Sequence, residues 1–269
     1  MGPSDFYIKY FSDLCCYEDY LMRVDLLGKK HNDKEILDSL RTCDEHRFII
    51  AGGEVIWIDD NGERVENPNI TSISDHVFEY CNDIQNVVIP NGVKTIEEYA
   101  FDGCSRLTSV TIPDSVTRIG DAAFYGCSWM NTVKIPDGVK SIGEDAFYAC
   151  RRLTSVTIPN SVKRIGEFAF AACDMLKSVT IPSSVKKISG YAFYYCGLTS
   201  VVIPDGVNNI RPYAFCGCIG LTSVTIPSSV TNIGDWAFRG CDKLKSIRVP
   251  EGCDTYSSTF PKDCEVIRY

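Results

Sequence analysis

One 23-residue pattern repeats along this chain and constrains its fold more than any other feature. The pattern reads I-G-x-x-A-F-x-G-C-x-x-L-T-S-V-T-I-P-x-S-V-x-x, with close copies that start at Ile96, Ile142 and Ile165. Its first isoleucine recurs at positions 73, 96, 119, 142, 165, 188, 210 and 233, so one interval is 22 residues long and the others are 23. A fixed period of this length is typical of a solenoid, in which each unit buries its apolar face only against its neighbours. Such a fold offers an extended surface rather than a deep pocket.

Within each unit the spacing of apolar residues changes. Leu107, Val110 and Ile112 alternate with polar residues as in a half-buried strand, and Pro113 ends this segment. The segment 119–124 has its inward residues at short helical or 3₁₀ spacing. We therefore expect each unit to add one strand to a parallel sheet and to return through a short helical turn. One phenylalanine per unit predicts a ladder through the core: Phe78, Phe101, Phe124, Phe147, Phe170, Phe193, Phe215 and Phe238.

Eight of the 14 cysteines occupy the same place in successive units, which argues against a disulfide framework. A residue locked to the period of an apolar ladder is most simply a small buried hydrophobe, so these are predicted to be reduced structural thiols. The remaining six have no metal-ligand spacing with histidine, and we predict neither a metal nor a cofactor. The eight repeated cysteines are Cys81, Cys104, Cys127, Cys150, Cys173, Cys196, Cys218 and Cys241.

The pattern divides the chain into an α+β head (1–68), a repeat array (69–255) and a C-terminal cap (256–269). In the head, Ser4 is expected to cap one helix and Asn32 a second over residues 33–43, followed by a hairpin of strands 47–51 and 54–58. The head is interpreted as a cap for the open end of the array, with a separate functional module as the alternative.

Two places depart from the regular pattern. The unit of Ile188 is one residue short after Cys196, which predicts a tightened turn. At the end of the array, Cys253 and Tyr256 take the valine and isoleucine positions, and residues 266–267 are expected to pair with the last strand.

The charge distribution excludes several classes of partner. Residues 1–72 carry 15 acidic and 8 basic side chains, a net charge of −7, so the remaining residues contribute −1 to the total of −8. A net-acidic chain without a Lys/Arg cluster is a poor ligand for nucleic acid. No run of 18 apolar residues occurs, and we predict no membrane insertion.

Residues that could carry chemistry are sparse. The chain has three histidines, His31, His46 and His76, and none belongs to a metalloprotease motif. No nucleophile elbow, Walker loop or dinucleotide fingerprint occurs, since the glycines belong to the repeat turns. The sequence therefore predicts a protein that is not an enzyme.

The string Ile-Gly-x-x-Ala-Phe-x-Gly-Cys-x-x-Leu-x-x-Val-x-Ile-Pro resembles the BspA-type, or Treponema-type, leucine-rich repeat over about residues 70–255. The resemblance implies a right-handed α/β solenoid, with a parallel β-sheet and short helical or 3₁₀ turns. Members of this family are mostly surface or secreted adhesins and interaction proteins of bacteria and parasitic protists, and their repeats are not enzymes. The chain shows no export signal, which predicts a cytoplasmic protein; a surface or secreted protein is the alternative if an export segment was removed.

Two surfaces of the array are candidates for binding. The first is a flat Ser/Thr face formed by the outward residues of the strands, with basic interruptions at Lys134 and Arg248. Threonine favours strands and neighbouring hydroxyls bond across them, so a purely structural role is the alternative to docking.

The second candidate surface lies on the turns, where the residues two before and one after each ladder phenylalanine are expected to share an outward face as i, i+3 neighbours. These pairs are Tyr99/Asp102, Ala122/Tyr125, Asp145/Tyr148, Phe168/Ala171, Tyr191/Tyr194, Tyr213/Cys216 and Trp236/Arg239. Exposed Tyr and Trp commonly anchor protein interfaces and sugar sites, although the rings could instead pack sideways on adjacent units. A nearby basic edge is interpreted as a solvated face neutralised by adjacent carboxylates. It consists of Lys94, Arg118, Lys140, Lys163, Arg164, Lys186 and Lys187.

The combined prediction is a non-catalytic module that binds a protein partner through the array. The predicted partner-binding residues are Tyr99, Tyr125, Tyr148, Tyr191, Tyr194, Tyr213, Trp236, Lys134 and Arg248. The alternatives are a surface adhesin for host protein or glycan, and an effector head carried on a repeat scaffold.

Overall fold

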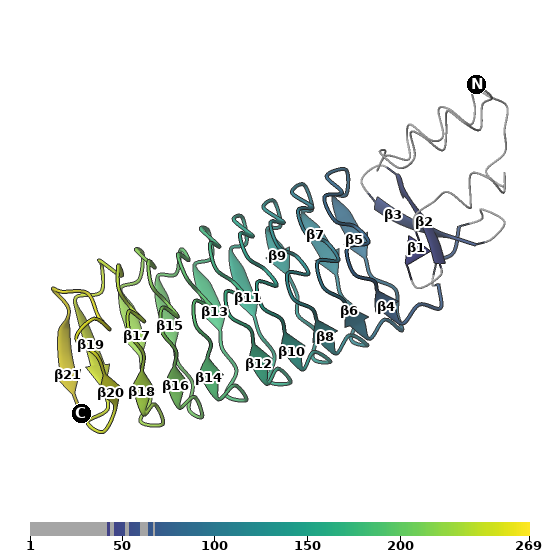
Figure 1. Cartoon of the computed structure of the whole chain (residues 1–269). Coiled ribbons are helices and arrows are strands. Elements are labelled where there is room, and N and C mark those ends of the chain that lie inside the picture. The colour runs from purple at the N-terminus through teal and green to yellow at the C-terminus, as the bar shows by residue number, and fades with distance from the viewer. Residues whose placement is uncertain (1–41, 44–45, 52–53, 60–63, 67) are drawn as a thin grey trace.

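The protein is an elongated solenoid whose successive turns stack side by side (Figure 1). The computed structural model describes residues 42–43, 46–51, 54–59, 64–66 and 68–269. The predicted N-terminal helices lie outside the described residues, except for the end of the second one. There the prediction is wrong, because Thr42–Cys43 form the two-residue strand β1. We call one turn of the solenoid a rung and name it by its isoleucine.

A first series of parallel strands runs along one side of the solenoid. Their inward residues stay in register from rung to rung, as in the pairing of Val87 with Val110 and of Val156 with Val179. The strands are β5 (Asn86–Val88), β7 (Ser109–Thr111), β9 (Thr132–Val133), β11 (Ser155–Thr157), β13 (Ser178–Thr180), β15 (Ser200–Val202), β17 (Ser223–Thr225), β19 (Ser246–Val249) and β21 (Glu265–Arg268).

A second parallel series, which the sequence did not predict, contains the repeated isoleucine and the residue before it. Ile73 pairs with Ile96, and Ile96 pairs with Ile119. Each rung therefore contributes two short strands rather than one. The strands are β4 (Ser72–Ile73), β6 (Thr95–Ile96), β8 (Arg118–Ile119), β10 (Ser141–Ile142), β12 (Arg164–Ile165), β14 (Lys187–Ile188), β16 (Asn209–Ile210), β18 (Asn232–Ile233) and β20 (Asp254–Thr255).

The segment that closes each rung is not helical, so the prediction of helical or 3₁₀ turns is wrong. No helix occurs in the part of the chain that the structure describes. In the rung of Ile96, Tyr99 has φ +54° and Gly103 has φ +66°, values that an α-helix cannot contain. The backbone N–H of Phe101 donates to Ala123 O of the next rung at 2.8 Å, not to a residue within its own turn. Stacking of rungs supplies the hydrogen bonds that a helix would make internally.

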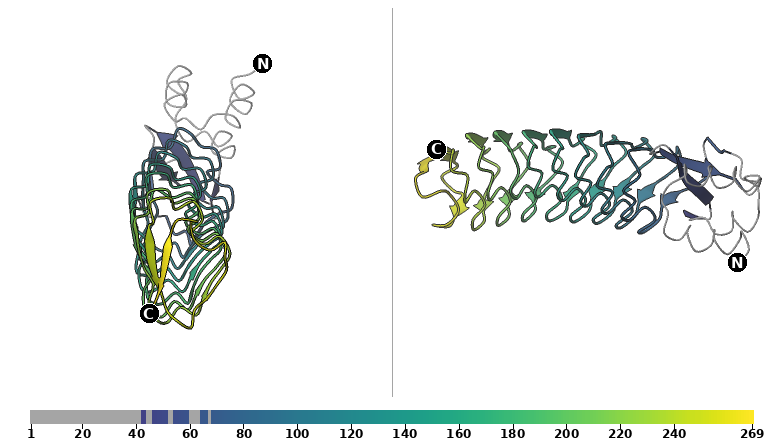
Figure 2. Two further views of the ribbon diagram at one scale, coloured as in Figure 1. Left: turned by 90° about the vertical axis from the view of Figure 1, so that its left-hand side faces the viewer. Right: turned by 90° about the horizontal axis from the view of Figure 1, so that it is seen from above.

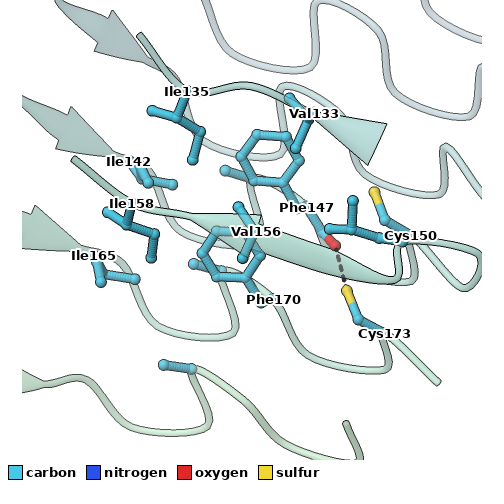
Figure 3. Packing of buried hydrophobic residues seen from close by; sticks show 14 of the residues in the cluster. Val133, Ile135, Ile142, Phe147, Cys150, Val156, Ile158, Ile165, Phe170 and Cys173 are labelled. Atoms are coloured by element: carbon cyan, nitrogen blue, oxygen red, sulfur yellow. Dashed lines mark hydrogen bonds between the residues drawn. The ribbon is translucent and has the colours of Figure 1, made fainter. Parts of the chain in front are cut away.

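The predicted phenylalanine ladder is confirmed and forms the centre of the core (Figure 3). Phe147 is fully buried, and its ring centroid lies 5.3 Å from that of Phe124 and 5.2 Å from that of Phe170, in nearly parallel planes. The ladder extends past the predicted set to Phe260, which stacks on Phe238 at 5.9 Å. The ring spacing measures the rise from one rung to the next.

The repeated cysteines are free thiols buried beside this ladder. Each thiol from Cys104 onward donates to the carbonyl of the phenylalanine 25 or 26 residues earlier; Cys173 Sγ lies 3.3 Å from Phe147 O (Figure 3). Burial raises the pKa of the Cys127, Cys150 and Cys196 thiols far above its usual range. These side chains therefore stay protonated, and they serve as donors to otherwise buried carbonyls.

The ladders are interrupted near the short rung of Ile188. The second series splits between β12 and β14. In the first series β13 and β15 do not join in one sheet, and breaks also occur between β9 and β11 and between β17 and β19. At this rung the hydroxyl of Ser189 donates to Ile165 O at 2.6 Å, whereas the equivalent Gly166 uses its backbone N–H to reach Ile142 O. The irregular sequence around Ile188 thus coincides with a local loss of strand pairing.

The C-terminal end follows the prediction with one correction. β21 pairs in parallel with β19, so Val266 lies beside Ile247 as expected. Thr255, not Tyr256, takes the isoleucine position, because it pairs with Ile233. The last rung is therefore one residue shorter between Cys253 and this position.

The predicted hairpin is confirmed as the antiparallel strands β2 (His46–Ala51) and β3 (Glu54–Ile58). It continues the first series of strands, because Glu54 in β3 pairs with Asn86 in β5 (Figures 1 and 2). Phe48 is buried with its ring centroid 4.6 Å from that of Phe78. The hairpin therefore covers the first ring of the ladder.

Candidate functional site

The strand face is exposed as predicted, and its hydroxyls bond from rung to rung. Thr157 and Thr180 are both exposed and lie in register on β11 and β13. At its edges Thr108 Oγ1 donates to Gln85 O at 2.9 Å and Thr222 Oγ1 donates to Thr199 O at 3.0 Å. These hydroxyls therefore bond neighbouring rungs of the solenoid to each other, so part of the hydrogen-bonding groups of the face is already used within the protein.

The two basic residues predicted on this face are both exposed. Lys134 follows β9, and Arg248 lies in β19 with its guanidinium carbon 4.9 Å from the centre of the Tyr269 ring. They stand on rungs far apart in the array. The strand face therefore offers a regular surface with separate charges.

On the turns, the predicted i, i+3 pairs do not all share one outward face, because no helix aligns them. Tyr191 and Tyr194 do contact each other, as do Trp236 and Arg239. In the rung of Ile96, Tyr99 is exposed but Asp102 is buried to 7% exposure. In the next rung the order reverses, since Ala122 is buried and Tyr125 is exposed. The first position of each pair has a left-handed backbone, not the helical backbone that the prediction assumed.

The aromatic residues of the turns stack in two different columns. Tyr125 and Tyr148 stack at 4.8 Å in the column one residue after the ladder phenylalanine. In the column two residues before it, Tyr191 stacks between Phe168 at 4.4 Å and Tyr213 at 4.5 Å. Sideways packing of rings on adjacent rungs, the structural alternative, is thus what the geometry shows.

The second stack continues into a larger group. Trp236 lies 5.5 Å from Tyr213, and the guanidinium of Arg239 covers its indole at 3.4 Å. Tyr194 makes an edge contact with Tyr191 at 5.4 Å and another with Tyr195 at 4.5 Å. We define the aromatic patch as Phe168, Tyr191, Tyr194, Tyr195, Tyr213, Trp236 and Arg239.

Tyr195 was missed by sequence reasoning. It lies two residues after the ladder phenylalanine, where Gly103, Gly126, Gly217 and Gly240 stand in other rungs with positive φ. Tyr195 adopts the same left-handed backbone at φ +52° and is 54% exposed. This conformation is an outlier for a bulky side chain and costs of order 1–3 kcal/mol. A large aromatic residue in a glycine position was the sequence signal that could have identified it.

Tyr80, at the other end of the array, repeats this feature at φ +56° and 64% exposure. Its ring covers Gly103 of the next rung, as the ring of Tyr195 covers Gly217. The charge of Asp102 raises the pKa of Tyr80, and burial raises the pKa of Asp102. Because Tyr80 lies beside carboxylates and Tyr195 among aromatic rings, the two sites differ chemically.

Two phenols of the aromatic patch have raised pKa values. Burial among neighbouring rings raises the pKa of Tyr191 and of Tyr194, with the adjacent Tyr213 and Tyr195 as further causes. The patch combines apolar ring surface with phenol hydroxyls and one cation, Arg239. Aromatic rings and arginine are the side chains most enriched at the energetic centres of protein interfaces.

The described residues hold no group of three or more His, Cys, Asp or Glu side chains arranged to bind a metal ion. Within the same residues, no helix is long and apolar enough to cross a membrane.

Comparisons with known proteins agree with this architecture. Residues 71–199 and 186–268 match the BspA type leucine rich repeat region, in six copies. A leucine-rich repeat protein from T. pallidum is 25% identical, with a TM-score of 0.53 over 74% of this chain and 87% of that chain. The pneumococcal vaccine antigen PcpA is 17% identical, with a TM-score of 0.44 over 85% of this chain and 86% of that chain. No curated protein sequence matches the chain. Because the repeat match extends from residue 71 to residue 268, the chain belongs to the BspA-type leucine-rich repeat family.

Proposed function

We propose that the array is a non-catalytic module that binds a protein partner through the aromatic patch. The observation that carries the proposal is the exposed Tyr195, which keeps a strained left-handed backbone where every other rung from Ile73 to Ile233, except that of Tyr80, has glycine or alanine. Strain of this kind is concentrated at functional sites. Tyr195 also lies against Tyr194, next to the largest run of stacked rings on the turns.

A non-catalytic role is supported by how the chemically reactive side chains are used. The buried thiols donate to phenylalanine carbonyls and have raised pKa values, so they are poor nucleophiles. His76 is engaged by Glu79 at 3.0 Å and stacks on Tyr99 at 4.8 Å.

We also propose that the hairpin of residues 46–58 acts as the N-terminal cap. It extends the sheet and covers the first ring of the ladder, which an open solenoid end requires for solubility.

The binding proposal is tested by capturing partners on the full chain and measuring their affinity for variants. Tyr195→Gly restores the residue of other rungs and should relieve backbone strain, so the protein should stay folded while binding weakens. With Tyr194→Ser and Trp236→Ser added, we expect a loss of about 2 kcal/mol or more, the size typical of central interface residues. Ala149→Gly is the matched control and should leave binding unchanged. Ala149 lies in the same column as Tyr195 and has a φ of +55°.

A strand-face variant, Thr157→Glu with Thr180→Glu, separates the two surfaces. The proposal expects this variant to bind normally. Loss of binding here, with full binding by the aromatic variants, would move the site to the strand face. Binding unaffected by both sets would exclude the array as the binding element.

The exposed ring of Tyr195 and the partly exposed rings beside it also favour a second candidate, an adhesin that recognises host protein or glycan, because sugar rings stack on Tyr and Trp faces. A glycan panel probed with the full chain distinguishes this candidate. Binding to a defined oligosaccharide that is lost in Trp236→Ser but kept in Ala149→Gly would favour it over a protein partner.

A further inference from the structure

A basic patch lies where the second series of strands is interrupted. Lys140, Lys163 and Lys186 occupy one column on three successive rungs, and Arg164 and Lys187 lie in the adjacent column on β12 and β14. All five side chains are exposed. Phenylalanine rings on the same rungs are 5.2 and 5.7 Å apart, so the three lysine positions extend over about 11 Å.

The charges of this patch are largely uncompensated. Arg164 pairs with Glu144 at 3.1 Å, but none of the four lysines forms an ion pair with another described residue. The earlier rung of Ile119 behaves differently, since Arg118 contacts Glu97 at 2.7 Å and Glu98 at 3.7 Å. The expected neutralisation of the basic edge therefore holds for the arginines and fails for the lysines.

The acidic residues that flank this patch are replaced by uncharged residues from one rung to the next. In the rung of Ile142 the basic residues have Asp137 before them and Glu144 after them. The same positions hold Asn160 and Glu167 in the rung of Ile165, and Ser183 and Gly190 in the rung of Ile188. The local excess of positive charge therefore grows along three rungs and is highest at Lys186 and Lys187.

Strand pairing is lost at the same place. Lys163 N donates to Lys140 O at 2.8 Å, and Asn208 N donates to Lys186 O at 2.9 Å. In the described chain no such bond joins Lys186 to Lys163, and β12 and β14 belong to different sheets. Like charges on facing strands are destabilising. An anion placed between these two rungs would relieve the repulsion.

We propose that this basic patch binds a short acidic segment of the protein partner. The proposal rests on the protein-binding function proposed above and names the chemistry of a second contact. The length of the patch matches about four residues of an extended chain, at about 3.3 Å per residue. A segment with a carboxylate on every second residue would present its charges about 7 Å apart on one side, within reach of flexible lysine ammonium groups.

The surroundings favour a short acidic peptide over a long polyanion. Thr117 and Asn208 occupy the lysine column on the rungs before and after, so the cationic column ends on both sides. Asp121, Glu144 and Glu167 form a carboxylate column beside it. A uniformly charged polymer such as a nucleic acid or a sulfated polysaccharide would extend past the cations and along these carboxylates.

The test measures binding of a labelled, alternating Glu-Ser peptide to the full chain by fluorescence anisotropy at several salt concentrations, with a Gln-Ser peptide as the neutral probe. We expect salt-sensitive binding of the acidic peptide only. The variant K163Q/K186Q/K187Q should weaken it about tenfold, the effect of losing three partly exposed charge contacts. K177Q/K243Q/K262Q removes the same charge from exposed lysines in other columns and should leave binding unchanged.

A charge reversal completes the test. The variant K163E/K186E/K187E should lose the Glu-Ser peptide and bind a Lys-Ser peptide instead. Equal weakening by both glutamine variants would indicate a general charge effect and overturn the proposal. Tighter binding of a sulfated oligosaccharide or an oligonucleotide than of the acidic peptide would overturn it in favour of a polyanion.

Failure of this proposal differs from failure of the proposed function. If a captured partner depends on Tyr195 and Trp236 but binds K163Q/K186Q/K187Q normally, the acidic contact is wrong and the binding module stands. If partner binding ignores the aromatic variants, the proposed aromatic site is wrong whatever the peptide does.

Discussion

Removing one ring from the middle of the phenylalanine ladder should damage the protein more than removing the last ring. Phe147 is fully buried and stacks on both neighbours, at 5.3 and 5.2 Å, so Phe147→Ala leaves a cavity open to two rungs. Complete loss of a buried phenylalanine side chain costs about 3–5 kcal/mol of unfolding free energy. Phe260 is half-buried and stacks on Phe238 alone, so Phe260→Ala should cost roughly 1–2 kcal/mol.

The position of the defect matters as well as its size. Rungs contact only their neighbours, so the stability of a solenoid is close to a sum of rung and interface terms. Phe147→Ala weakens two interfaces near the centre and should uncouple the two halves, broadening the unfolding transition and lowering its denaturant dependence. Phe260→Ala should shift the midpoint slightly and leave the slope unchanged.

Urea unfolding followed by far-UV circular dichroism measures both quantities, with Phe147→Leu as a control that keeps most of the apolar volume. We expect the leucine variant to lose less than about 1.5 kcal/mol. Equal costs for Phe147→Ala and Phe260→Ala, or an unchanged slope for both, would refute the view that stacked rings couple the rungs.

Two further predictions concern the thiols and the glycines. Burial raises the pKa of thiols such as Cys150 in the folded protein, so each keeps its proton there, whereas the same thiol in the unfolded chain loses its proton near about pH 8.5. The free energy of unfolding should therefore stay constant below about pH 8. Above it, the free energy should fall by about 1.4 kcal/mol per pH unit for each such thiol. Urea midpoints measured up to about pH 10 should show this fall, and Cys150→Ala should make it shallower; an equally steep fall in that variant would contradict the assignment. A Cβ on Gly166 would lie 2.4 Å from backbone atoms of Gly143, so Gly166→Ala should cost about 1–3 kcal/mol. A Cβ on Gly126 would meet no atom closer than 3.7 Å, so Gly126→Ala should cost only about 1 kcal/mol of unfolding free energy, for its φ of +67°. If urea unfolding showed a larger cost for Gly126→Ala than for Gly166→Ala, the contact between Gly166 and Gly143 would not set the separation of the rungs.

Much of the interior was predictable because a fixed period assigns every residue to a column. Phe147 and Cys150 follow from spacing alone, since residues one period apart must occupy equivalent places in a stacked solenoid. The second series of strands was not predictable, because two-residue strands such as β8 are too short to show an alternating pattern. The turns were misjudged because apolar spacing does not report the sign of φ, and Tyr99 and Ala122 are left-handed.

The candidate site was predictable only in part. The sequence located the column that contains Tyr191, Tyr213 and Trp236. It did not show which residue of each i, i+3 pair is exposed, and the stacking between rungs depends on that. Tyr195 and the cationic pair Lys163 and Lys186 were not recognised as sites. Their character arises from contacts or repulsions between residues on adjacent rungs.

The sequence by itself determined that the chain is a solenoid, which residues form its ladder and where the ladder is irregular. A repeated apolar pattern fixes these features, because each unit can bury that pattern only against its copies. The tertiary structure decided which side chains are exposed, how the rings stack and where like charges meet. Those properties depend on the backbone conformation of each turn and on neighbours 22 or 23 residues away, which only the stacking of rungs brings together.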